Sequence, residues 1–425
     1  MTAPPDIAIV GAKIEIGDGR VIDNGIVVIH GNLISAVGDT ASNSAPEGAQ
    51  IINGKGLTVY PGFVDAYSTS GLKLPTARPS GSTLPDTRNT APATMWHANR
   101  KGIRSDVQAS KCLDLKAPYT DQFAQGITSV LLSGGDGSIA GTACFVNLAA
   151  APHVLVPEAA TEVVVRGGSG GFGGDEMAGG QRPSATTGAP SYPYPSTPFG
   201  TFALTRQTFL DAKFNQALAK PIVDPTYDNL KPLLSGKIPA LFTVSSAREI
   251  VRATHLADEF GFRMIVNGGN DAYRVIDSLS KYHASVIINL DLPDEPDKKP
   301  GDGKDATPAR VLEDRWNIWK ERQANAKTLD DAHIPLALRG GAGLSGYLAG
   351  VRRVVKGGLS RESALKAMTL GAAKIFGVDD RIGSIESGKL ANLVIMSGDF
   401  LDEKSKVQTV FVEGVKNELK KEGSK

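Results

Sequence analysis

Hydrophobic positions near the two ends of the chain follow the pattern of short strands joined by tight turns. β-Branched runs at Ile7–Val10 and Gly25–Ile29 are separated by Gly-Asp-Gly and followed by Gly-Asn, which is typical of hairpins. Strand-like runs recur at Ala391–Met396 and Val407–Val412. Because long apolar edge strands must be covered, we expect the strands of both termini to pair in one small domain.

The middle of the chain alternates strand-like runs with helical periodicity. Ala247–Phe260 and Ser360–Phe376 have apolar residues spaced by three and four, with Ser360 as a candidate N-cap and Gly377 as a candidate stop. Such alternation predicts an α/β fold with a parallel sheet, which closes economically as a (β/α)8 TIM-like barrel. The strand-like runs lie at 127–132, 238–244, 263–266, 285–290 and 334–338.

These patterns predict two domains. We expect a composite β-sandwich from residues 1–60 plus 378–425, and a barrel from residues 61–377. Residues 166–200 are rich in Gly, Pro, Ser and Tyr and lack periodicity, so we predict a long loop over one barrel face that could act as a lid.

Composition excludes several classes of function. The formal net charge is +1 and no basic cluster of five residues occurs, so we expect no nucleic-acid partner. No apolar run reaches the length of a membrane span, so we expect no membrane partner. The start of the chain shows no signal peptide, but a removed one leaves no trace, so periplasmic and cytoplasmic locations both remain open.

Several motifs carry a resemblance to a known family. Pro61-Gly62-Phe63-Val64-Asp65-Ala66 resembles the first barrel strand of the amidohydrolase superfamily, and residues 383–394 resemble its closing segment, with Asn392 where Asp is common. Residues 253–262 and 368–373 are most similar to the imidazolonepropionase-like branch. The resemblance implies a barrel with a composite β-sandwich, and a divalent metal that activates water for attack on carbon–nitrogen bonds.

The metal-ligand motifs of that family are missing. The His-x-His that follows the first strand in the family is replaced by Tyr67 and Thr69. The resemblance places later ligand positions at Thr243 and Ser245, near Gly268 and near Gly341, none of which supplies an imidazole or a carboxylate. Some members bridge two metals with a lysine on the fourth strand, but residues 117–212 contain no lysine, which closes this option if the fourth strand lies there. We therefore predict no metal ligands, no catalytic residues and no cofactor.

The same positions define a candidate pocket at the carboxyl ends of the strands. His97 is included because the loop after the first strand should border the pocket, and Arg339 would bring a positive charge that disfavours a metal cation. The predicted substrate-binding residues are Tyr67, Thr69, His97, Thr243, Ser245, Asn267 and Arg339.

Three functions remain open at this point. The first is a pseudoenzyme: a non-catalytic binding or partner subunit that forms a homo-oligomer or pairs with an active amidohydrolase relative. The alternative is an active hydrolase of a non-peptide amide, cyclic amide or small peptide, with zinc in a rebuilt site that uses residues such as His97, Asp65 or Asp271. The third is binding of an anionic small molecule through Arg339 and the glycine-rich loop.

Overall fold

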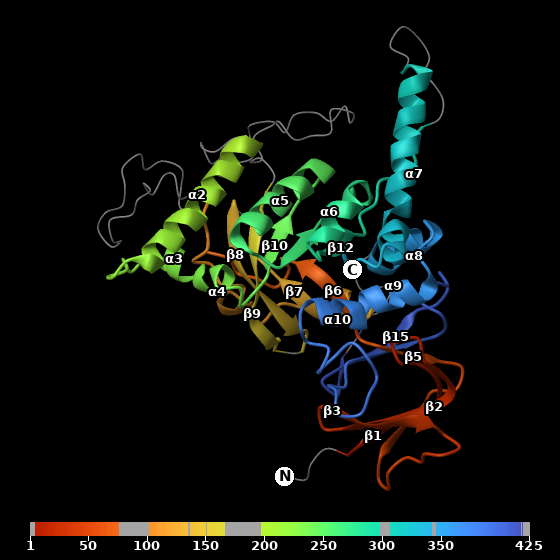
Figure 1. Ribbon diagram of the computed structural model, residues 1–425. Helices are drawn as coiled ribbons and strands as arrows, with labels where there is room; N and C mark the ends of the chain where they lie inside the picture. The colour runs from red at the N-terminus through yellow and green to blue at the C-terminus, as the bar shows by residue number, and fades with distance from the viewer. Residues whose placement is uncertain are drawn as a thin grey trace.

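The computed structural model describes residues 5–75, 102–134, 137–149, 151–165, 197–297, 307–341, 346–417 and 419. They form two eight-stranded sheets with helices packed around the second sheet (Figure 1). Among the described residues, no helix is both long and apolar enough to cross a membrane.

The first sheet combines strands from both ends of the chain. Strand β5 lies at the centre of this sheet and joins the two sets of strands. It pairs in parallel with β1 from the start of the chain and antiparallel with β14 from its end. The order is β16-β15-β14-β5-β1-β2-β3, with β4 paired to β1. The strands are β1 (Ile7–Glu15), β2 (Val21–His30), β3 (Leu33–Asp39), β4 (Gln50–Asn53), β5 (Thr58–Pro61), β14 (Leu393–Met396), β15 (Val407–Val412) and β16 (Val415–Asn417).

The second sheet is a nearly closed barrel in which the strands follow chain order from β6 to β13. The two end strands approach each other where the Gly340 N–H donates to Asp65 Oδ1 over 2.9 Å. The Tyr347 hydroxyl also donates to the Val64 carbonyl over 2.8 Å. The strands are β6 (Phe63–Ser68), β7 (Ile127–Leu132), β8 (Ile139–Asn147), β9 (His153–Val164), β10 (Ala240–Thr243), β11 (Met264–Asn267), β12 (Ser285–Asn289) and β13 (Leu336–Arg339).

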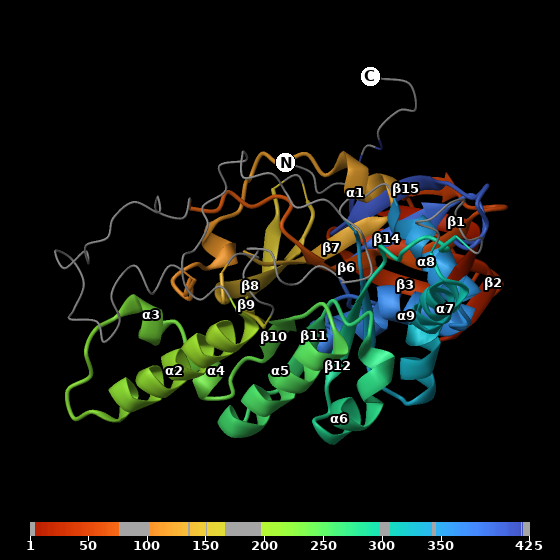
Figure 2. The ribbon, with the colours of Figure 1, turned by 90° about the horizontal axis from the view of Figure 1, so that it is seen from above.

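The helices lie outside this barrel-like sheet, and Figure 2 shows α2, α4, α5 and α6 side by side along one flank. The longest, α7, extends away from the rest of the molecule in Figure 1. The helices are α1 (Thr120–Ala124), α2 (Pro198–Ala217), α3 (Pro225–Asp228), α4 (Lys231–Leu234), α5 (Ala247–Phe260), α6 (Ile276–Lys281), α7 (Ala309–Asp331), α8 (Tyr347–Lys356), α9 (Arg361–Met368) and α10 (Leu370–Ile375), with 3-10 turns η1 (Ala109–Lys111) and η2 (Ala272–Val275).

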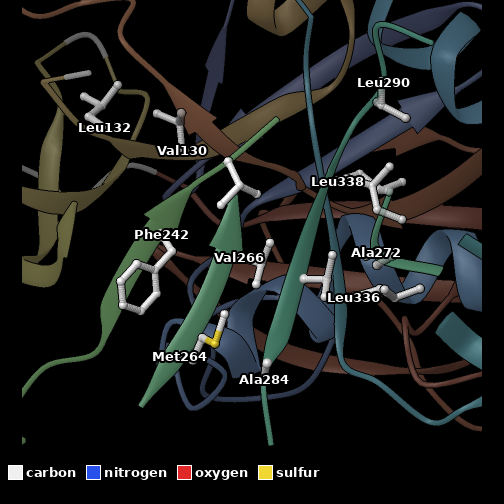
Figure 3. Packing of buried hydrophobic residues seen from close by; sticks show 14 of the residues in the cluster. Val130, Leu132, Phe242, Met264, Val266, Ala272, Ala284, Leu290, Leu336 and Leu338 are labelled. Carbon is white, nitrogen blue, oxygen red and sulfur yellow. The ribbon is translucent and has the colours of Figure 1, made fainter. Parts of the chain in front are cut away.

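The barrel strands are apolar on both sides, which is why they read as continuous hydrophobic runs. Residues such as Phe242, Val266 and Leu338 belong to the cluster that packs against the helices (Figure 3). Their neighbours along the strands form a second cluster inside the barrel, completed by Phe376 beyond α10. The inner residues of the strands include Val64, Leu131, Ala160, Leu241, Ile265, Ile287 and Ala337.

A buried polar network joins the two sheets. Asn392, just before β14, donates from Nδ2 to Asn147 Oδ1 over 3.0 Å, and its Oδ1 accepts from the Glu413 N–H over 2.8 Å. Asn147 Oδ1 also accepts from Ser129 Oγ, and its Nδ2 donates to Glu413 Oε1. These contacts tie the closing segment of the chain to β7 and β8.

The mixed α/β fold, with a barrel-like sheet and a second sheet, is confirmed. A complete ring of alternating helices is not confirmed, because β8 runs antiparallel to both β7 and β9. The connections before and after β8 are too short for a crossover helix, which needs a dozen residues or so. The division into domains at residues 60 and 378 stays a prediction.

Local signals in the sequence place several helix ends. The bounds of α5 match the predicted stretch, and the Ser360 hydroxyl caps α9 by accepting from the Ser363 N–H over 3.0 Å. The stretch after Ser360 is two helices rather than one, because the backbone leaves helical geometry at Thr369. The predicted loop 166–200 lies outside the described residues up to 196, and α2 already begins at Pro198.

Candidate functional site

Polar side chains lie at the carboxyl ends of four barrel strands, on the inner side of the sheet. Each stands two residues after an inner apolar residue, and side chains two apart along a strand lie on the same face. The pairs are Ala160 and Glu162, Leu241 and Thr243, Ile265 and Asn267, and Ala337 and Arg339. The strand ends therefore add a polar layer above the apolar interior.

Glu162 is the centre of this layer, and its side chain is fully buried. Its Oε1 accepts hydrogen bonds from the hydroxyls of Thr243 over 2.6 Å and Tyr67 over 3.0 Å. Its Oε2 accepts from the Ser133 hydroxyl over 2.5 Å. Asn267 Nδ2 in turn donates to Thr243 Oγ1 over 3.0 Å. We call these five residues the Glu162 cluster.

Arg339 adds a positive charge beside the cluster. Its guanidinium carbon lies 5.2 Å from the centre of the Tyr67 ring, which is a cation–π contact. The Arg339 residue is only partly buried as a whole, but its Nε atom is buried.

Asp65 lies where the two ends of the sheet meet, and it is 2% exposed. Burial raises its pKa to about 6, opposed by hydrogen bonds from the N–H groups of Gly340 and Tyr67 and by the charge of Arg339. Burial, together with the Asp65 charge, also raises the pKa of Tyr347 well above its usual range. Asp65 thus accepts hydrogen bonds from backbone amides, as buried polar groups in proteins usually do.

The structure brings together four of the predicted site residues, namely Tyr67, Thr243, Asn267 and Arg339. Thr69 does not join these residues. An irregularity in the pairing of β6 interrupts the alternation of its side chains, and the strand ends at Ser68. Thr69 follows the strand and is exposed. Whether these residues bind a ligand stays a prediction.

Ser245 also lies away from the cluster. It is exposed, and both its backbone N–H and its hydroxyl donate to Glu249 Oε2 in the first turn of α5, over 2.6 and 2.9 Å. Ser245 is thus bound to the first turn of α5, because the Glu249 carboxylate accepts both of its hydrogen bonds. His97 lies outside the described residues.

Sequence reasoning missed Glu162 and Ser133. The signal for Glu162 is a lone carboxylate in the run Ala159-Ala160-Thr161-Glu162-Val163-Val164-Val165, since an unpaired charge is costly in a buried strand. Neither β9, which carries Glu162, nor its hairpin partner β8 is among the strands predicted from the sequence. Glu162 lies on β9, the strand before β10. It falls within residues 117–212, the stretch that contains no lysine.

The donor set of the cluster does not fit the divalent metal that the resemblance implies. Zinc prefers imidazole, thiolate and carboxylate ligands, whereas the cluster offers one carboxylate, hydroxyls and an amide. Within the described parts of the chain, no group of three or more His, Cys, Asp or Glu could hold a metal ion. Asp271, another candidate ligand, instead pairs with Arg322 over 2.8 Å.

Comparisons with known proteins agree with the resemblance. The profile of the amidohydrolase family matches residues 309–416. An amidohydrolase from Thermotoga maritima is 23% identical, with 97% of this chain and 100% of that chain covered and a TM-score of 0.72. A prolidase solved with N-methylphosphonate-L-proline is 18% identical, with 98% and 100% covered and a TM-score of 0.56. No curated protein matches the chain.

A putative prolidase from Bifidobacterium longum is similar over 98% of this chain and 95% of its own, at 14% identity and a TM-score of 0.52. At these sequence identities the similar structures establish the fold only. The function has to be inferred from the residues of the site. The chain is therefore amidohydrolase-like, as the motifs at Pro61–Ala66 and 383–394 predicted.

Proposed function

We propose that this protein is a pseudoenzyme of the amidohydrolase type, which binds a small molecule at the carboxyl ends of its barrel strands without metal-dependent hydrolysis. The observation that carries this proposal is the Glu162 carboxylate, whose two oxygens accept from three hydroxyls. Two of these hydroxyls belong to Tyr67 and Thr243, which stand at positions where the resemblance predicts metal ligands. In this account the barrel is a variant of the (β/α)8 fold and the first sheet is its composite domain.

The energetics of the cluster support the proposal. A buried carboxylate is costly unless it is paired or hydrogen-bonded, and the hydroxyls of Tyr67, Ser133 and Thr243 meet that requirement. Binding a dication would have to rearrange these hydrogen bonds, and the guanidinium of Arg339 would repel it. The Glu162 carboxylate is thus satisfied by hydrogen bonds without a metal.

Arg339 suggests the charge of the ligand. A guanidinium beside a buried polar layer favours a carboxylate or phosphate, which it can bind through two parallel hydrogen bonds. We therefore propose an anionic small molecule as the ligand. A homo-oligomer, or a complex with an active relative, is the quaternary arrangement that we propose for such a subunit.

The test is an assay for turnover with and without zinc. N-acyl amino acids, cyclic amides and dipeptides are incubated with the protein after chelation and after addition of zinc, and products are detected by mass spectrometry. We expect no hydrolysis above buffer in either state. Hydrolysis that is abolished by Glu162→Gln but retained in Glu158→Gln, a partly exposed residue on the same strand, would establish the alternative, an active hydrolase with a rebuilt site.

A further inference from the structure

One polar atom of the Glu162 cluster has no hydrogen-bond partner in the part of the chain that the structure describes. The side chain of Asn267 is fully buried, and its Nδ2 donates to Thr243 Oγ1. Its Oδ1 is buried and has no hydrogen-bond partner among the described residues. A buried acceptor without a donor is costly, so this atom is a position at which a bound molecule could gain binding energy.

The orientation of the Asn267 amide follows from its neighbours. Thr243 has one hydroxyl proton, and that proton is donated to Glu162 Oε1 over 2.6 Å. Thr243 Oγ1 can therefore only accept from Asn267, which requires the NH2 group to face it. The reversed amide would place two oxygens against each other. The atom left without a partner is thus an acceptor, and it calls for an N–H or O–H group.

The contacts link this acceptor to the cation of the site. They run from Arg339 to the Tyr67 ring, from the Tyr67 hydroxyl to Glu162, and on through Thr243 to Asn267. A guanidinium and an orphan acceptor on one polar layer match an acid that carries a hydrogen-bond donor.

We propose that Asn267 Oδ1 selects the ligand by accepting from its hydroxyl or amino group, and that the ligand is a small hydroxy or amino acid whose carboxylate binds Arg339. This inference rests on the proposed function, since it assigns the ligand of the same site. It makes Asn267 a specificity-determining residue next to Gly268, near which the resemblance places a metal ligand.

The test uses three acids with three carbons that differ only at the second carbon: propionate, lactate and alanine. Their affinities for the full chain are measured by isothermal titration calorimetry. We expect lactate or alanine to bind at least fivefold more tightly than propionate. Equal affinities, or no binding by any of the three, would overturn the inference.

Two variants assign the preference to Asn267. Asn267→Leu removes the acceptor at similar volume, and Asn267→Ser removes it with a shorter polar side chain. In whichever variant keeps the wild-type circular dichroism spectrum, the preference over propionate should disappear, whereas Asn53→Leu on the exposed strand β4 should retain it. A preference that survives in a folded Asn267 variant would contradict the role of this residue. Zinc content, measured separately, tests the proposed function itself.

Discussion

The hydroxyl of Tyr67 donates to the carboxylate of Glu162, with 3.0 Å between the two oxygens, and so joins β6 to β9 at the carboxyl end of the barrel. Tyr67 occupies the position where the resemblance to amidohydrolases predicts the first histidine ligand. The residue that stands in place of a metal ligand is therefore a hydrogen-bond donor to a buried carboxylate. The predictions below test this arrangement and the structure around it.

Removing the Glu162 carboxylate should destabilise the protein strongly. Glu162→Ala leaves the three hydroxyls of Tyr67, Ser133 and Thr243 without their acceptor and opens a cavity, so we expect a loss of about 3–5 kcal/mol in the free energy of unfolding. Urea unfolding followed by circular dichroism measures it. Glu158→Ala, whose carboxylate lies 3.5 Å from the exposed Lys237, should cost about 1 kcal/mol or less. Equal losses would argue against the cluster.

Asp65 should make stability depend on pH in an unusual direction. Its pKa is raised to about 6 in the folded chain, above the ordinary value of 3.8, so the folded state binds the proton more tightly. Its contribution is therefore fully present below about pH 4 and is lost as the pH rises through about 6.

Asp65→Asn should remove this dependence. The amide oxygen can still accept from the N–H of Gly340, and no charge is buried at neutral pH. We expect the variant to gain about 1–3 kcal/mol relative to wild type at pH 7.5, with the gain shrinking toward pH 4.5. Unfolding in urea at the two pH values measures the difference, and a pH-independent loss would show that the charge of Asp65 is not a cost.

The junction between the two sheets should reject a carboxylate at position 392. Asn392→Asp places an oxygen against Asn147 Oδ1, where Nδ2 now donates over 3.0 Å. Asn147 cannot reverse its amide without losing its own bond to Glu413. We expect a loss of about 2–3 kcal/mol in urea unfolding. Asn53→Asp is the control, because its oxygen accepts from the Lys55 N–H and an aspartate keeps that bond; a similar loss there would contradict the explanation.

Sequence reasoning reached much of the fold because local signals determine it. The run Ile127–Leu132 is β7, and the stretch Ala247–Phe260 is α5. The sequence does not predict the β8–β9 hairpin, because β8 and the second half of β9 are buried on both faces and lack alternation. For the same reason the site was predicted only in part: Tyr67 was found by its place in a motif, whereas Glu162 becomes meaningful only when distant strands bring three hydroxyls to it.

The most direct test of the central claim is the zinc content of the protein purified without chelator, followed by the melting temperature with and without added zinc. The account predicts far less than one zinc per chain and no zinc-dependent rise in melting temperature, because the Glu162 cluster satisfies its carboxylate with hydroxyls. About one tightly held zinc per chain, or a clear rise in melting temperature on its addition, would contradict the claim.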